Sequence, residues 1–124
     1  MRRFPPSSSN PEWWVPKTDI YISEEGHLVI EVELAALKKE DLELTIEDKR
    51  LIVRGERSDG GRRQRCQYLV KELRYGPFES AIEVPPDYDL AQARASYQNG
   101  ILRIDVPRKP QSDRGSGAPT APAP

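Results

Sequence analysis

The dipeptide Asn99-Gly100 constrains the fold of this chain more than any other feature of its sequence. Both residues tolerate positive φ, which the two central positions of a type I′ turn require, so the pair is a strong signal for a β-hairpin. After it, residues 101–106 alternate between apolar and charged side chains, the pattern of a strand that buries one face. Before it, residues 93–98 alternate in the same way, with Ala93, Ala95 and Tyr97 on one face. The sequence therefore predicts a sheet that ends in this hairpin.

The remaining apolar alternations predict further short strands at the spacing of an all-β fold, an immunoglobulin-like two-sheet β-sandwich. The predicted strands cover residues 19–22, 28–34, 42–47, 51–54, 68–73 and 78–84. In the clearest of them, residues 28–34, the even-numbered side chains are apolar and Val29 falls with two glutamates on the opposite face. We expect one helical turn within residues 35–41 and a tight turn at residues 48–50.

The two ends of the chain differ in composition from its middle. Proline, serine and asparagine dominate the start, which predicts a flexible arm over residues 1–13, and a Gly, Pro, Ser and Ala-rich stretch predicts a disordered tail over residues 108–124. One domain of residues 14–107 remains between them. Trp13 and Trp14 stand at its start, and we expect one of them to dock on the domain as an anchoring contact, with a partner contact as the alternative.

Charge, cysteine content and hydropathy exclude several classes of protein. The formal net charge is only −1, so no global field favours nucleic acid or an anionic membrane, and the expected partners are proteins. Cys66 is the single cysteine, so no internal disulfide can form, and with His27 as the single histidine no structural zinc site is expected. No apolar run approaches the ~18 residues of a membrane-spanning helix, and the start lacks the apolar centre of a signal peptide. We expect a cytoplasmic protein.

The sequence offers little catalytic chemistry. No glycine-rich phosphate loop is present, so nucleotide use has no local support, and no cofactor or metal is expected. His27 stands beside a predicted turn and is interpreted as a solvated turn residue. The basic run Arg62–Arg65 could contact RNA, but no aromatic residue is interleaved in it, so an exposed, solubilising loop over residues 57–67, with Cys66 in it, is the favoured interpretation. The chain is not expected to be an enzyme.

Strand edges are the remaining candidates for function. A sandwich has unpaired edges, which proteins either protect or use to bind another strand. Residues 42–46 and 93–97 are candidates for such use. The alternative, in which both strands are internal and their apolar faces lie wholly in the core, is equally compatible with the pattern.

The hairpin and its surroundings resemble a known family. Residues 95–102 match the A-x-x-x-N-G-x-L signature of the small heat-shock proteins, the α-crystallin domain family, through Ala95, Asn99, Gly100 and Leu102. Other blocks resemble the family in the same order: Trp14-Val15-Pro16, Lys39-Glu40-Asp41-Leu42, Leu51–Arg57, Tyr75-Gly76-Pro77-Phe78 and Val84-Pro85. The bacterial and plant type is most similar, because its members carry a long loop and an extra strand where this chain has residues 57–74.

The resemblance implies a sandwich of seven to eight strands and an ATP-independent holdase that captures unfolding proteins before they aggregate. It implies a client-binding groove formed by Leu42, Leu44, Ile46, Ala93, Ala95 and Tyr97. It implies a homodimer formed by strand exchange, in which Tyr68, Leu69, Val70 and Leu73 of one subunit meet Asp19, Ile20, Tyr21 and Ile22 of the other. The alternative function is a non-chaperone adaptor on the same sandwich, similar to the CS-domain co-chaperones.

Three departures from the family pattern limit these expectations. Ala35-Ala36 replaces the usual Pro-Gly, and Ser80 replaces the arginine of the F-x-R block, so any interface role of that arginine is lost or passes to another residue. The chain after Pro107 contains no isoleucine or valine, so the I-x-I anchor of the family is missing. We therefore expect a dimer or a small oligomer, to which a partner subunit could supply the anchor.

Overall fold

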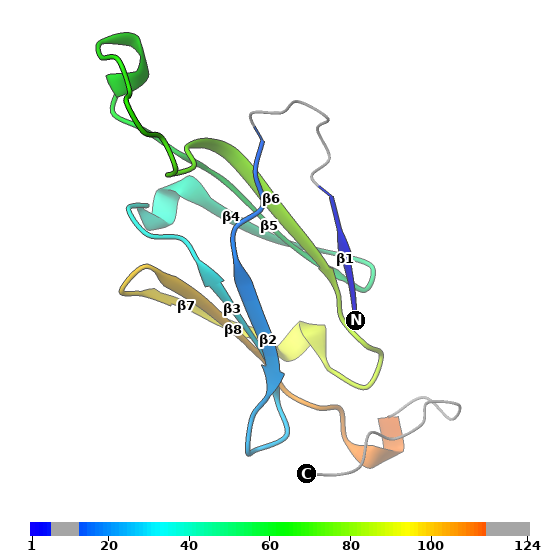
Figure 1. Cartoon of the computed structure of the whole chain (residues 1–124). Coiled ribbons are helices and arrows are strands. Elements are labelled where there is room, and N and C mark those ends of the chain that lie inside the picture. The colour runs from blue at the N-terminus through cyan, green and yellow to red at the C-terminus, as the bar shows by residue number, and fades with distance from the viewer. Residues whose placement is uncertain (6–12, 114–124) are drawn as a thin grey trace.

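The computed structural model describes residues 1–5 and 13–113 of the chain (Figure 1). These residues form eight strands in two four-stranded sheets, and neighbouring strands pair antiparallel throughout. The strands are β1 (Arg2–Phe4), β2 (Thr18–Ile22), β3 (Leu28–Glu33), β4 (Leu42–Glu47), β5 (Arg50–Arg57), β6 (Gly76–Glu83), β7 (Arg94–Gln98) and β8 (Ile101–Val106). The predicted all-β, two-sheet sandwich is confirmed.

The order of strands leaves the sandwich open on two sides. One sheet has the order β1-β6-β5-β4 and the other β2-β3-β8-β7. Figure 1 shows β1 and β2 at one side of the sandwich and β4 and β7 at the other. We call these the β1/β2 side and the β4/β7 side. Four 3-10 turns complete the described structure: η1 (Lys39–Asp41), η2 (Arg62–Gln64), η3 (Leu90–Gln92) and η4 (Gln111–Asp113). The turn η1 confirms the helical turn predicted between residues 35 and 41.

The core lies between the two sheets and consists almost entirely of aliphatic side chains. Its buried members are Trp14, Leu28, Ile30, Val32, Leu34, Leu51, Val53, Phe78, Ile82, Val84, Leu102, Ile104 and Val106. Trp14 confirms the expectation that one tryptophan docks: its ring centroid lies 5.2 Å from that of Phe78. Its backbone also bonds to the edge of β6, where it accepts from the Glu79 amide and donates to the Pro77 carbonyl, both at 3.2 Å. Val29, expected on the polar face, is fully buried.

Both predicted hairpins are present. Asn99 and Gly100 have φ values of 54° and 79°, and the pair Gln98–Ile101 closes the turn, as a two-residue type I′ connection requires. A Cβ at Gly100 would also lie 3.2 Å from the Ala35 Cα, a tight contact that adds to the conformational preference for glycine here. The β4–β5 turn is one residue shorter than predicted, because Arg50 already pairs with Glu47.

The predicted strand at residues 68–73 is wrong for the single chain. This segment forms no strand, and Leu69 and Val70 are 93% and 74% exposed. It belongs to the long connection that projects from one end of the sandwich, drawn in green in Figure 1. An alternating pattern shows that a segment can pair, but pairing also requires a neighbouring edge, and the described part of this chain offers none beside the segment.

Both ends of the domain extend further than the sequence predicts. Residues 2–4, expected in a flexible arm, form β1 on the edge of β6, where the Arg50 guanidinium lies 3.7 Å from the centre of the Phe4 ring. At the other end, expected to be disordered, the Lys109 amide donates to the Asp87 carbonyl at 2.7 Å. The rest of the predicted arm and tail, residues 6–12 and 114–124, lies outside the described residues.

Candidate functional site

The β4/β7 side presents apolar side chains that belong to the inner face of the sandwich. Leu44 pairs with Val53 and Ile46 with Leu51, and directly paired residues share a face of their sheet. Their partners lie in the core, yet Leu44 and Ile46 are 39% and 49% exposed, because the sheet ends at β4. The inner face therefore continues to solvent at this side.

The edge strand β7 contributes to the same side. Ala95 pairs with Ile104 and Tyr97 with Leu102, so these side chains also lie on an inner face. The Tyr97 hydroxyl donates to the Leu34 carbonyl, which fixes the ring at the rim of the core. Of the six residues expected at the client site, Leu42, Leu44 and Ile46 share the inner face of β4, Ala95 and Tyr97 share that of β7, and Ala93 lies just before β7 and packs against the core. The alternative, with both strands internal, is wrong.

The β1/β2 side exposes a second strand edge. β2 is the outermost strand of its sheet, and its Tyr21 and Ile22 side chains are 39% and 46% exposed. The other residues expected at the dimer interface lie on the projecting connection, where Leu73 is 65% exposed. Within one chain the structure does not bring the two sets together (Figure 1).

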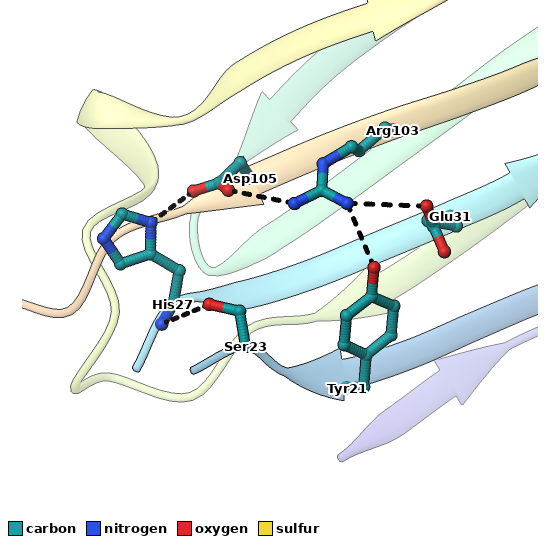
Figure 2. A network of polar contacts seen from close by, with 6 residues as sticks. All are labelled: Tyr21, Ser23, His27, Glu31, Arg103 and Asp105. Atoms are coloured by element: carbon teal, nitrogen blue, oxygen red, sulfur yellow. Dashed lines mark hydrogen bonds and ion pairs between the residues drawn. The ribbon is translucent and has the colours of Figure 1, made fainter. Parts of the chain in front are cut away.

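A row of charged residues crosses the outer face of the β2-β3-β8-β7 sheet (Figure 2). The His27 Nδ1 lies 2.6 Å from Asp105 Oδ1, and the Arg103 guanidinium lies 3.5 Å from both Asp105 and Glu31. Arg103 Nη1 also donates to the Tyr21 hydroxyl at 3.0 Å. Desolvation acts against its charge, but Tyr21, Glu31 and Asp105 raise the pKa of Arg103 above its ordinary value. His27 is hydrogen-bonded to Asp105 rather than simply solvated, and the Arg103 contacts tie β2 to β8.

The long connection carries the basic run where the sequence predicts it. Cys66 and its neighbours are exposed, as expected. The fold also brings aromatic rings from elsewhere in the chain to arginines of this connection: Arg62, in the run, donates from Nη2 to the Tyr75 hydroxyl at 2.8 Å, and the guanidinium of Arg57, before the run, lies 4.5 Å from the Trp14 ring. These contacts join residues far apart in sequence, so inspection of the run alone misses them.

Two further classes of site receive no support from the described structure. Over residues 1–5 and 13–113, no three or more His, Cys, Asp or Glu side chains gather in a way that could hold a metal ion. Within the same residues, no helix is long and apolar enough to cross a membrane. The candidate sites are therefore the two open sides of the sandwich.

Comparison with known proteins identifies this arrangement. Residues 20–117 match the Hsp20/alpha crystallin family. The chain belongs to this family. It is 32% identical over 108 residues to the small heat shock protein C2 of Rickettsia felis, a match that covers 87% of this chain and 70% of that protein. It is 30% identical over 88 residues to the 18.1 kDa class I heat shock protein of Arabidopsis thaliana, covering 70% of this chain and 54% of that protein.

Solved structures of small heat shock proteins share the fold. The hspA of Xanthomonas axonopodis superposes with a TM-score of 0.69 at 29% identity, over 78% of this chain and 96% of that one. A small heat shock protein from Xylella fastidiosa gives a TM-score of 0.69 at 27% identity, over 87% and 94%. Bacterial and plant proteins both occur among the relatives, which confirms the resemblance drawn from the hairpin motif. The family assignment supports an ATP-independent chaperone role and gives the adaptor alternative no better support.

The structure shows which residue takes the place of the arginine that is missing from the F-x-R block. Ser80 is fully buried where the family usually has an arginine. The guanidinium of Arg3, from β1, donates to the Ser80 Oγ at 3.0 Å and to the Thr18 Oγ1 at 3.5 Å. An arginine from another strand thus reaches this position, and the sequence hides it because residue 3 lies in the expected arm. In the second departure, Ala36 adopts φ 63°, the conformation that glycine favours.

Proposed function

We propose that this small heat shock protein captures partly unfolded client proteins on its β4/β7 side, without ATP. The observation that carries the proposal is the half-exposure of Leu44 and Ile46 on a face that is otherwise buried. An unfolding client offers extended backbone and apolar side chains, and both can be satisfied at a sheet edge with an apolar rim. Binding of this kind is driven by removal of apolar surface from water, so it needs no nucleotide.

The charges on the edge strand support reversible capture. Glu43 and Glu47 alternate with the apolar residues of β4 and point to its outer face, where the Arg54 guanidinium lies within 4.0 Å of both carboxylates. Charged residues on an edge strand are a device by which soluble proteins avoid uncontrolled edge-to-edge pairing. The β4 edge therefore combines an apolar inner face that can bind apolar side chains with a charged outer face that disfavours uncontrolled pairing.

We further propose a homodimer in which residues 68–73 of each subunit pair with β2 of the other. Two features support this exchange: the segment presents exposed Leu69 and Val70, and β2 presents a free edge with exposed Tyr21 and Ile22. A closed two-fold dimer would cover both surfaces in each subunit. Residues 108–124 contain no isoleucine or valine and so supply no I-x-I contact themselves, and the dimer or a small oligomer is the proposed species.

The cytoplasm is the proposed compartment. The single cysteine cannot form an internal disulfide, so nothing in the domain requires an oxidising environment.

The deciding experiment follows the light scattering of a heat-aggregating client in nucleotide-free buffer. We expect protection that rises with the ratio of this protein to client, and an equal mass of an inert globular protein as control should give none. Protection that appears only with ATP would contradict the holdase. A specific complex with one folded partner, without protection of any client, would favour the adaptor. Light scattering coupled to size exclusion measures the assembly, and a species of twelve or more subunits would contradict the proposed size.

A further inference from the structure

A depression opens on the β1/β2 side, and its walls come from both sheets. Its volume is about 330 Å³, and its lining residues are Met1, Arg3, Ile20, Tyr21, Ile22 and Leu28. β2 and β3 supply apolar side chains, while β1 supplies the wall that belongs to the other sheet. The depression therefore exists in this form only while β1 is paired with β6.

Arg3 holds this wall in place. It pairs with Ile82, a core residue, so its side chain lies on the inner face of the sandwich, whereas Arg2 and Phe4 lie on the outer face. From there its guanidinium donates to the Ser80 Oγ on β6 and to the Thr18 Oγ1 on β2. One side chain thus joins the edges of the two sheets and leaves its aliphatic stem along the depression.

We propose that β1 forms one wall of the seat that receives residues 68–73 of a second copy of this chain, with Arg3 as the residue that positions the wall. This inference rests on the exchange dimer proposed above and assigns a part in it to the N-terminal strand. The two-fold dimer then contains two such seats, each built from β1 and β2 of one subunit and filled by the connection of the other.

Three observations select the second copy as the occupant. The depression is continuous with the free β2 edge, so a strand added there would place alternate side chains over it. The segment that would be added carries Leu69, Val70 and Leu73, which are 93%, 74% and 65% exposed and have no apolar cover in their own subunit. Its charges, Lys71 and Glu72, are also opposite in sign to those of Asp19 and Arg3 at the seat.

The proposal makes Arg3 a determinant of dimer affinity, although its hydrogen bonds lie within one subunit. Without them β1 keeps its three residue pairs, the Arg2–Glu83 ion pair and the contacts of Phe4, but it loses the Arg3 link to β2 on its inner side, so the seat is less well preorganised for the incoming segment. Loss of the Arg3 hydrogen bonds affects both seats of a symmetric dimer. A weakening of about threefold at each seat therefore becomes about tenfold in the dimer dissociation constant.

The test compares dimer dissociation constants from sedimentation equilibrium for the wild-type chain, Arg3→Ala, Arg2→Ala and Val70→Asp. Arg2 is the matched control, because it lies on the same strand with its side chain outward, 3.6 Å from Glu83 and 73% exposed. We expect Arg3→Ala to weaken the dimer about tenfold or more, Arg2→Ala to change it less than about threefold, and Val70→Asp to abolish it. Circular dichroism checks that each variant keeps its sheet signal.

Two results would overturn the inference, and they are distinguishable. If Val70→Asp abolishes the dimer while Arg3→Ala matches Arg2→Ala, the exchange dimer stands and β1 has no part in its seat. If Val70→Asp leaves the dimer intact, the exchange itself fails, and the seat fails with it. A selective effect of Arg3→Ala in a chain that still folds is the outcome that supports the proposal.

Discussion

Two isoleucines, one on each open side, allow the proposed functions of the two sides to be tested separately by the same substitution at each position. Ile46 on β4 is 49% exposed and Ile22 on β2 is 46% exposed. Both lie at an outermost strand, on opposite sides of the same sandwich. Ile46→Asp and Ile22→Asp therefore introduce the same charge at the same depth, and we expect the first to weaken client capture and the second to weaken dimer formation.

The expected magnitudes follow from the exposed half of each side chain. Full burial of an isoleucine is worth about 1.5–3 kcal/mol, so covering the exposed half of Ile46 with a client contributes about 0.7–1.5 kcal/mol. An aspartate loses this term, and its carboxylate must also be partly desolvated under a client, which brings the total to about 2 kcal/mol. That loss corresponds to roughly thirtyfold weaker capture. Folding loses only the half that is already covered, about 1 kcal/mol, and equally in both variants.

The assay measures three quantities for each variant: the free energy of unfolding in urea, the dimer dissociation constant and the protection of a heat-aggregating client. We expect similar unfolding free energies for the two variants, reduced protection only for Ile46→Asp and a weakened dimer chiefly for Ile22→Asp. If both variants reduce protection equally while dimerisation is unchanged, the β4/β7 side has no special role in capture, and the reasoning from exposed inner-face residues is refuted.

Three further predictions test particular contacts. Gly55→Ala should lower the free energy of unfolding in urea by about 3 kcal/mol, because the new Cβ would lie 2.3 Å from the Asp41 carbonyl oxygen. Gly60→Ala is the control: nothing lies within 4 Å of its Cβ, and its φ of +70° should cost only about 1 kcal/mol. Equal losses in the two variants would contradict the predicted clash at Gly55. Cys66 should react with a thiol reagent in the native protein, and protection until denaturant is added would refute its exposure. The hydrogen bond from the Gly61 amide, together with Arg63, holds the pKa of Asp59 below its ordinary value. The Gly61–Asp59 hydrogen bond should therefore be fully formed above the ordinary pKa of an aspartate and be lost as the pH falls through the lowered pKa. A titration midpoint for Asp59 at or above the ordinary value, measured by NMR, would disprove this hydrogen bond.

Local chemistry made part of this fold predictable. The type I′ turn at Asn99-Gly100 is set by the backbone preferences of two adjacent residues, and the alternation in residues 28–34 reports the burial of one face. The same alternation correctly placed Leu44 and Ile46 toward the interior. It could not decide between an edge and an internal position for residues 42–46, because edge position depends on which strands pair, and pairing is set by the whole fold.

Most of the features that sequence reasoning missed depend on contacts between distant residues. Residues 2–4 carry no strand pattern and become β1 because β6 offers an edge 77 residues or more away. His27 gains its partner Asp105 across 78 positions, and Arg3 reaches Ser80 across 77. Residues 68–73 show the opposite error, since a strand pattern is present and no edge in the described part of the chain receives it.

The two open sides follow from how this small domain distributes its edges. Two four-stranded sheets have four edge strands, here β1, β4, β2 and β7. In the first sheet, β1 and Trp14 of the same chain pair with β6 and cover the edge that β6 would otherwise expose. A sandwich that closed its remaining edges would hide Leu44 and Ile46 on one side and Tyr21 and Ile22 on the other, and it would lose both surfaces proposed for association. Exposed edges also invite indiscriminate pairing, which favours covering one of them by a specific second copy. If the β1/β2 side is closed in the dimer as proposed, the β4/β7 side is left as the surface for unfolded chains, and capture and self-association no longer compete for the same edge.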